Sequence, residues 1–176
     1  TEGHPEVVAS FVVSGNEAEL LLAAASLQQG SEHPLAHAVL QAASRSALEL
    51  NTIDEFRSHT GRGVSGRVGG AQVLVGNQFF MADNGFEAPV SESPSERWEN
   101  EGKTVIWVAR SGEVLGALAI ADPLRPESVA AILELKALGV RTLLISGDSE
   151  RVSKEIGRQV GVDITKGGFK PDDKAF

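Results

Sequence analysis

The residues best suited to chemistry form the string Ser31-Glu32-His33-Pro34-Leu35, which lies between two helix-like segments. Pro34 biases His33 away from helical conformation, and its fixed φ suits the first position of the helix that follows. Ser31 or Glu32 can accept hydrogen bonds from the exposed amides at that helix start. The string therefore predicts an imidazole held beside a helix N-terminus. By itself it fits a simple cap and turn better than a ligand site.

Glycines before a later strand could leave bare backbone for a ligand. Gly61-Arg62-Gly63 enters a β-branched segment, and glycine in a strand usually marks a bulge or a close backbone approach. No Lys-Ser or Lys-Thr pair follows, which excludes a Walker loop, and a hairpin follows instead of a helix, which excludes a dinucleotide fingerprint. A bulge without a ligand is favoured on these residues alone.

A third group, Ser146-Gly147-Asp148, follows an aliphatic segment and precedes a helix. Ligands bind at this position in open α/β sheets, because backbone amides and the helix dipole favour an anion. The Ser146 hydroxyl can donate to phosphate oxygens, and Asp148 can hold Mg²⁺ or cap the helix. Lys174, in a charged segment, could neutralise the same phosphate or be a solvated surface lysine.

The composition excludes several classes of function. The 176 residues carry 16 basic and 24 acidic side chains, a net charge of −8, which argues against nucleic-acid binding because that needs a basic patch. There is no cysteine, so disulfides and thiolate metal sites are excluded. No apolar run reaches the ~20 residues of a membrane span. We expect the sequence to be part of a longer protein.

Hydrophobic patterning predicts the elements that must position these groups. Up to about residue 118, strands joined by tight turns predict an antiparallel sheet with helices on one face. The predicted strands span 7–13, 53–58, 64–68, 71–75, 104–109 and 113–121, and the predicted helices span 16–29, 34–48, 78–84 and 95–102.

From residue 122 the pattern becomes α/β. An amphipathic helix over 127–138 is predicted to face inward through Val129, Ile132, Leu133 and Leu138. A strand over 140–145, buried on both faces of a parallel sheet, a helix from 149 and a strand over 162–164 follow. The proline-rich segment 122–126 between the two patterns is the predicted hinge.

Together the motifs resemble one family, the P-type ATPases of the heavy-metal-transporting subclass. In chain order they are Ser31-Glu32-His33-Pro34-Leu35, Gly61-Arg62-Gly63, Val75-Gly76-Asn77, Asp122-Pro123-Leu124-Arg125-Pro126, Ser146-Gly147-Asp148 and Pro171-Asp172-Asp173-Lys174. The first string is highly specific to that subclass. The resemblance implies an α+β ATP-binding domain over 6–118, joined to part of a haloacid-dehalogenase-like α/β phosphorylation domain over 119–176 with 1–5.

The resemblance also implies roles for individual residues. His33 would stack against or orient adenine, and Gln28 stands where the family commonly has a glutamate and could still accept from the adenine amine. The implied ATP-binding residues are Gln28, Glu32, His33, Gly61, Gly63, Gly76 and Asn77. The implied residues near the transferred phosphoryl group are Ser146, Gly147, Asp148 and Lys174, with Mg²⁺ as the accompanying ion.

The implied function is the ATP-binding cytosolic portion of a membrane metal pump that works through an aspartyl-phosphate. Copper(I) is the first choice of cargo, Zn²⁺ or Cd²⁺ the alternative, and membrane helices outside this sequence would bind it. A stand-alone phosphatase would need an Asp-x-Asp motif near its amino terminus, which is absent; a non-catalytic nucleotide-binding module remains open.

The family's phosphorylated Asp-Lys-Thr-Gly-Thr segment is also absent from these 176 residues. The chain is therefore expected to bind ATP without becoming phosphorylated. It is further expected to be a monomer that faces the cytoplasm and binds no nucleic acid.

Overall fold

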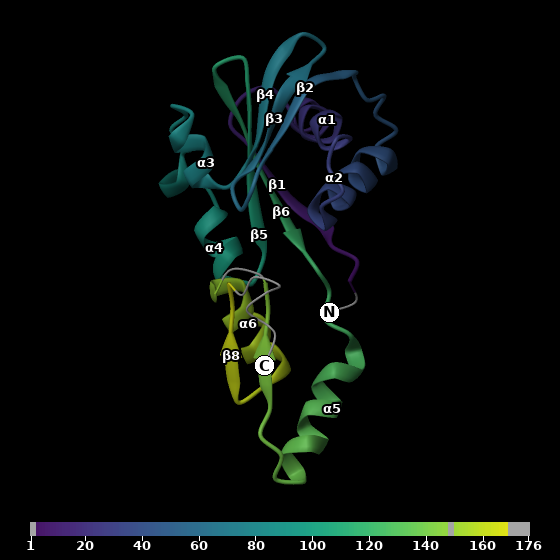
Figure 1. The fold of residues 1–176 in the computed structure, drawn as a ribbon, viewed down its shortest axis with the longest axis vertical. Coiled ribbons are helices and arrows are strands. Elements are labelled where there is room, and N and C mark those ends of the chain that lie inside the picture. Colours follow the sequence, from purple (N-terminus) through teal and green to yellow (C-terminus); the bar gives the residue numbers. More distant parts are fainter. Residues whose placement is uncertain (1–2, 148–149, 169–176) are drawn as a thin grey trace.

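A computed structural model describes residues 3–147 and 150–168. The molecule is elongated, with a large sheet and its helices in one half and a smaller α/β unit in the other (Figure 1). The large sheet has the order β1-β6-β5-β4-β3-β2, and all its pairings are antiparallel. Its strands are β1 (Glu6–Val12), β2 (Ile53–His59), β3 (Gly63–Val68), β4 (Ala71–Gly76), β5 (Thr104–Arg110) and β6 (Glu113–Ala121). The predicted antiparallel sheet is confirmed.

Helices cover both faces of this sheet, so the prediction of helices on one face was wrong. Helices α1 (Glu17–Gln28) and α2 (Pro34–Arg45) lie on one face, and α3 (Gln78–Asp83) and α4 (Ser95–Asn100), with the 3-10 turn η1 (Val90–Glu92), lie on the other (Figure 1). Along β5, Trp107 packs in one buried cluster and Val108 in the other. A strand buried on both sides reads as a continuous apolar run, and all five residues from 105 to 109 are buried.

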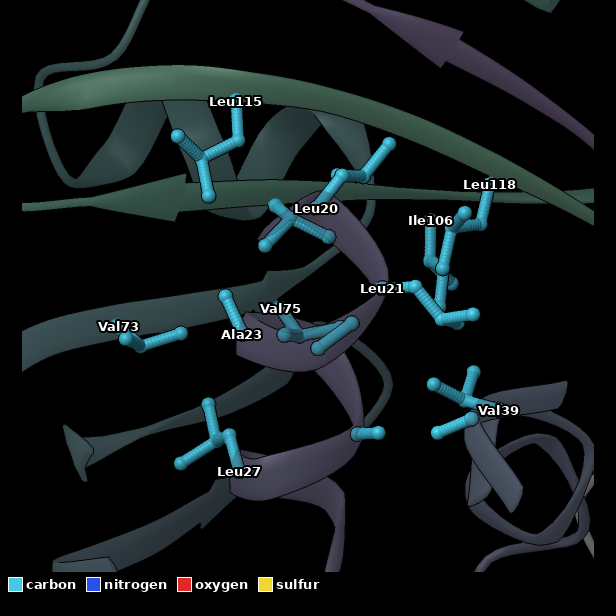
Figure 2. Close-up of a cluster of buried hydrophobic side chains, with 14 of the residues drawn as sticks. Leu20, Leu21, Ala23, Leu27, Val39, Val73, Val75, Ile106, Leu115 and Leu118 are labelled. Atoms are coloured by element: carbon cyan, nitrogen blue, oxygen red, sulfur yellow. The ribbon is translucent and has the colours of Figure 1, made fainter. Parts of the chain in front are cut away.

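Helix α1 forms the centre of the larger core. Asn16 caps it, because its Oδ1 accepts a hydrogen bond from the Glu19 amide at 3.0 Å. Leu20 and Leu27 are 0% exposed and point from the helix into the cluster that strands β4 and β6 line (Figure 2). Burial of each such side chain contributes about 2 kcal/mol. This core fixes the end of α1 from which the first motif follows.

The smaller unit contains α5 (Pro126–Ala137), β7 (Leu143–Ile145), α6 (Glu150–Val160) and β8 (Ile164–Lys166). Strands β7 and β8 are parallel, which confirms the predicted parallel pairing.

The predicted burial of helix α5 and strand β7 was wrong. Leu133 and Leu138 are 60% and 78% exposed, Val129 is 36% exposed, and Leu143 of β7 is 51% exposed. Within the described residues α5 packs chiefly against α6. An amphipathic pattern identifies the apolar face of a helix but not whether another element covers it.

No helix in the described part of the chain is long and apolar enough to cross a membrane.

Candidate functional site

His33 itself caps helix α2. Its Nδ1 accepts a hydrogen bond from the Leu35 amide at 3.2 Å, and its own amide donates to Ser31 Oγ at 3.2 Å. The cap was predicted to be Ser31 or Glu32, so that assignment was wrong. The imidazole can reach back to the amide because Pro34 starts the helix and leaves His33 extended. Since Nδ1 accepts, the neutral ring carries its proton on Nε2, on an exposed side chain.

The two glycine motifs form one local structure. The Asn77 amide donates to the Arg62 carbonyl at 2.9 Å, and Asn77 Nδ2 donates to the Gly61 carbonyl at 3.1 Å. Asn77 Oδ1 accepts from the Phe80 amide and so caps α3. One asparagine therefore joins the loop before β3 to the end of β4.

The glycines of this structure differ in what surrounds them. Gly63 and Gly76 are paired across β3 and β4. A Cβ on Gly63 would lie 2.3 Å from the Val75 carbonyl oxygen, and one on Gly76 would lie 2.6 Å from Phe80 Cδ1. At Gly61, whose φ is +70°, a Cβ would meet no described atom within 4 Å. A side chain at Gly63 or Gly76 would therefore clash with packed neighbours, whereas a side chain at Gly61 would enter open space.

Gln28, at the end of α1, holds a buried acceptor without a partner. Gln28 is 6% exposed, and among the described residues its Oε1 accepts no hydrogen bond. Leaving such an atom unsatisfied costs about 1–3 kcal/mol. A donor group from a ligand would remove this cost, and the contact of Gln28 with the adenine amine stays a prediction.

One cleft connects the two halves of the molecule. Its volume is about 870 Å³, in the range of small-molecule sites. His33, Asn77 and Lys103 line it from the large half, where Lys103 lies in the loop between α4 and β5, and Gly147 lines it from the small unit. We call it the His33 cleft. Of the other described residues predicted for the site, Gln28, Glu32, Gly61, Gly63, Gly76 and Ser146 are not part of its lining.

The described part of the third motif, Ser146-Gly147, follows a strand and precedes a helix, as predicted. Ser146 follows the carboxyl end of β7, and its amide donates to the Lys166 carbonyl at 2.9 Å. Gly147 is exposed and lines the cleft. Asp148 and Lys174 lie outside the described residues, so their predicted roles stay predictions.

Helix α6 is tied to α4 beside the cleft. Arg151 Nε donates to Asn100 Oδ1 at 2.8 Å, and Arg151 Nη1 donates to Glu99 Oε2 at 3.0 Å. The helix approaches closely at Gly102, where a Cβ would lie 3.1 Å from Glu155 Cγ. These contacts hold the small unit against the large sheet.

Polar contacts also fix the other walls of the cleft. Asp122 lines it, and its Oδ1 accepts from the amides of Gly3 and His4 at 3.1 and 3.2 Å. Lys103 Nζ lies 2.5 Å from Glu101 Oε2. The hydrogen bond from the Lys103 ammonium lowers the pKa of the Glu101 carboxyl.

Comparison with known proteins decides the family. The family model described as "haloacid dehalogenase-like hydrolase" matches residues 1–176, the whole chain. The chain belongs to the haloacid dehalogenase-like hydrolase family.

Within the haloacid dehalogenase-like hydrolases, the resemblance to heavy-metal P-type ATPases is confirmed. The chain is 33% identical over 175 residues to a silver exporting P-type ATPase of Salmonella typhimurium, covering 99% of this chain and 21% of that protein. It is 35% identical over 177 residues to the probable copper-transporting ATPase PacS of Synechococcus elongatus, covering 99% and 24%. The chain thus spans about a fifth to a quarter of the length of these relatives.

Solved structures give the same relationship. A zinc-transporting PIB-type ATPase in the E2.Pi state aligns with a TM-score of 0.67 and 34% identity over 98% of this chain and 28% of that one. The N-domain of HMA8, a copper-transporting P-type ATPase, aligns with a TM-score of 0.57 and 26% identity over 66% of this chain and 99% of that one.

Two cationic residues of the cleft escaped the sequence analysis of this haloacid dehalogenase-like chain. Lys103 and Arg151 both line the His33 cleft. Each stands in a charged segment typical of a solvated surface, and no spacing separates either from other surface cations. Their position at the cleft depends on the contact between α4 and α6, which the sequence does not reveal.

Proposed function

We propose that this chain is the ATP-binding cytosolic portion of a membrane heavy-metal pump, whose full-length form hydrolyses ATP through an aspartyl-phosphate. The observation that carries the proposal is the His33 cleft. His33 and Asn77 line it on one side and Gly147 lines it on the other. A nucleotide in this cleft would place its base toward the large sheet and its phosphates toward the small unit.

The proposed domains follow the change of architecture. Residues 6–118 form the ATP-binding domain, and 119–176 with 1–5 form part of the phosphorylation domain. The similarity of two thirds of the chain to an excised N-domain supports the division, and so does the end of β6 at Ala121.

At the adenine end, we assign base recognition to Gln28 and His33. The unpartnered Oε1 of Gln28 would accept from the adenine amine, and the exposed imidazole of His33 would stack on the ring or orient it. The remaining residues proposed for this end are Glu32, Gly61, Gly63, Gly76 and Asn77. Gly61 offers open backbone there, while Gly63 and Gly76 shape the strand pair behind it.

At the phosphoryl end, we assign Ser146 and Gly147, with Asp148 and Lys174 outside the described residues. The Ser146-Gly147 segment lies between a parallel strand and a helix start, where backbone amides favour an anion. Mg²⁺, when bound with ATP, would neutralise phosphoryl charge. The chain's own part is to present donors and, through Asp148, an oxygen ligand.

For the cargo, we propose copper(I), with Zn²⁺ or Cd²⁺ as the second candidate. Copper and silver are named for the relatives, whereas the zinc-transporting structure favours the second candidate. The ion would bind to membrane helices outside these residues. We place the full-length protein in the cell membrane with this portion, as a monomer, facing the cytoplasm.

Calorimetric titration of the chain with ATP, ADP and p-nitrophenyl phosphate tests the proposal. We expect ATP to bind, the phosphate ester not to turn over, and radiolabelled ATP to leave no acid-stable phosphate on the protein. His33→Asn should weaken ATP binding about tenfold, because the ring supplies stacking worth ~1–3 kcal/mol while asparagine keeps a capping acceptor.

His37→Ala is the matched control, since His37 is exposed on the same helix and is absent from the cleft lining. Its ATP affinity should equal that of the wild type. Turnover of p-nitrophenyl phosphate without ATP binding would instead support a stand-alone phosphatase.

A further inference from the structure

The backbone contacts of Lys103 hold this residue beside the junction of the two halves. Its amide donates to the Trp98 carbonyl at 2.9 Å, and Trp98 is 4% exposed. The next residue, Thr104, begins β5. The Lys103 Cα is thus fixed by a buried tryptophan on one side and a sheet strand on the other. Lys103, whose side chain is 26% exposed, is one of the residues that line the His33 cleft.

Few cationic side chains line the cleft that could bind the phosphate chain of a nucleotide. Among the described lining residues, Lys103 and Arg151 are positive, and Glu99 and Asp122 are negative. Arg151 is bonded to Glu99 of the same lining and to Asn100. Its guanidinium is therefore neutralised and serves to hold α6 on α4. A nucleotide brings several negative charges, and Arg151 can meet them only by giving up contacts that tie α6 to α4.

Lys103 is free of this restriction. Its ion pair is with Glu101, two residues away in the same loop, and does not join two elements. Glu101 is itself about half exposed and also pairs with Arg97 at 3.7 Å. The ammonium can therefore turn from Glu101 to a bound anion without any helix moving, and Glu101 keeps a cationic partner.

We propose that Lys103 binds the phosphate chain of the nucleotide in the His33 cleft and that Glu101 holds its ammonium in place when the cleft is empty. The inference rests on the proposed function, because it needs a nucleotide in this cleft. In this proposal the α4–β5 loop provides the cation that binds the phosphates, between the base end of the site and the Ser146-Gly147 end.

The test is titration of the chain with adenosine, ADP and ATP by calorimetry, in the wild type and in Lys103→Met. Methionine keeps the length of the side chain and removes the charge. We expect the affinity for ATP and ADP to fall about tenfold, the size of one charge-assisted hydrogen bond. The affinity for adenosine should stay the same, because it has no phosphate.

Lys154→Met is the matched control. It makes the same change of residue and of net charge on α6, where Lys154 pairs with Glu150 and does not line the cleft. Its ATP affinity should stay within about twofold of the wild type, since the Lys154 side chain is 65% exposed and salt screens an exposed charge. Glu101→Gln should raise the ATP affinity about twofold, and it should have no such effect when combined with Lys103→Met.

The outcomes separate the inference from the proposed function. No ATP binding by the wild-type chain overturns both. If the wild type binds ATP and Lys103→Met weakens it no more than Lys154→Met does, only the inference is overturned. An equal loss for adenosine and ATP also overturns it, because the role would then be structural. Lys103→Arg should retain binding, and circular dichroism should show all variants folded.

Discussion

At the scale of single residues, Gln28 is expected to lower the stability of the fold while it contributes to ligand binding. Its buried Oε1 has no partner among the described residues, so Gln28→Leu removes an unsatisfied acceptor and should raise the free energy of unfolding by about 1 kcal/mol. The same change should weaken ATP binding and abolish any preference for ATP over GTP, because the donor on adenine loses its acceptor. Urea unfolding and calorimetry measure the two effects. A variant that is less stable and binds ATP normally would contradict the assignment.

The glycines give a second prediction at this scale. Gly63→Ala should destabilise the chain by about 2–3 kcal/mol, because its Cβ would lie 2.3 Å from the Val75 carbonyl oxygen. Gly61→Ala should cost only about 1 kcal/mol, the strain of φ +70°. Urea unfolding of both variants provides the measurement. Equal losses would show that the Gly63–Gly76 pair is not closely packed in solution.

The residue scale also shows what the sequence could and could not predict. The fixed position of His33 followed from Pro34, because that restriction is local. The identity of the cap did not, since Ser31, Glu32 and His33 all carry acceptors near the same amides. Lys103 could not be found, because its place at the cleft depends on where α6 packs.

At the scale of elements, helix α6 should lose stability in acid. Arg158 donates to both oxygens of Glu155 and Gln159 donates to one, which lowers the pKa of Glu155 to about 2. The folded-state pKa lies below the ordinary value of 4.5, so the carboxylate stabilises the fold above pH 4.5 and loses this contribution as the pH falls toward 2. The Tm of the wild type should therefore exceed that of Glu155→Gln at neutral pH, and the difference should shrink toward pH 2.

Scanning calorimetry or circular dichroism at several pH values measures this difference. Arg158→Met, which removes the main donor, should lower the Tm at neutral pH but have little effect in the Glu155→Gln background. A Tm difference that stayed constant from neutral pH to about pH 2 would contradict the role of this carboxylate.

Secondary structure and strand pairing were largely predictable because they depend on local patterns. The hairpins β3–β4 and β5–β6 follow from their glycine-containing turns. The turns do not predict which face of the sheet each helix covers. A turn determines that two strands pair, but it does not determine the face on which a later helix packs. The exposure of α5 has the same cause, because periodicity describes a helix and not its surroundings.

At the scale of the whole molecule, Asp122 lies where the chain leaves the large sheet for the smaller unit. Its Oδ1 accepts from the amides of Gly3 and His4, just beyond the point where Glu6 pairs with Ala121. One carboxylate thus ties the N-terminal segment to the start of the segment that connects the halves. Asp122→Ala should loosen this connection and widen the range of openings of the His33 cleft, which Asp122 lines. The ATP affinity should then fall, because a smaller fraction of the molecules would have the cleft in the conformation that binds ATP.

Spin-label distances can measure this opening directly, because the chain has no cysteine of its own. Labels at Ser44→Cys on α2 and Glu134→Cys on α5 lie on exposed positions of the two halves. Asp122→Ala should broaden the distance distribution between them. Asp122→Asn should leave it narrow, because the amide oxygen can still accept from both backbone amides. If Asp122→Asn broadened the distribution as much as Asp122→Ala, the charge of Asp122 and not these two hydrogen bonds would hold the halves together.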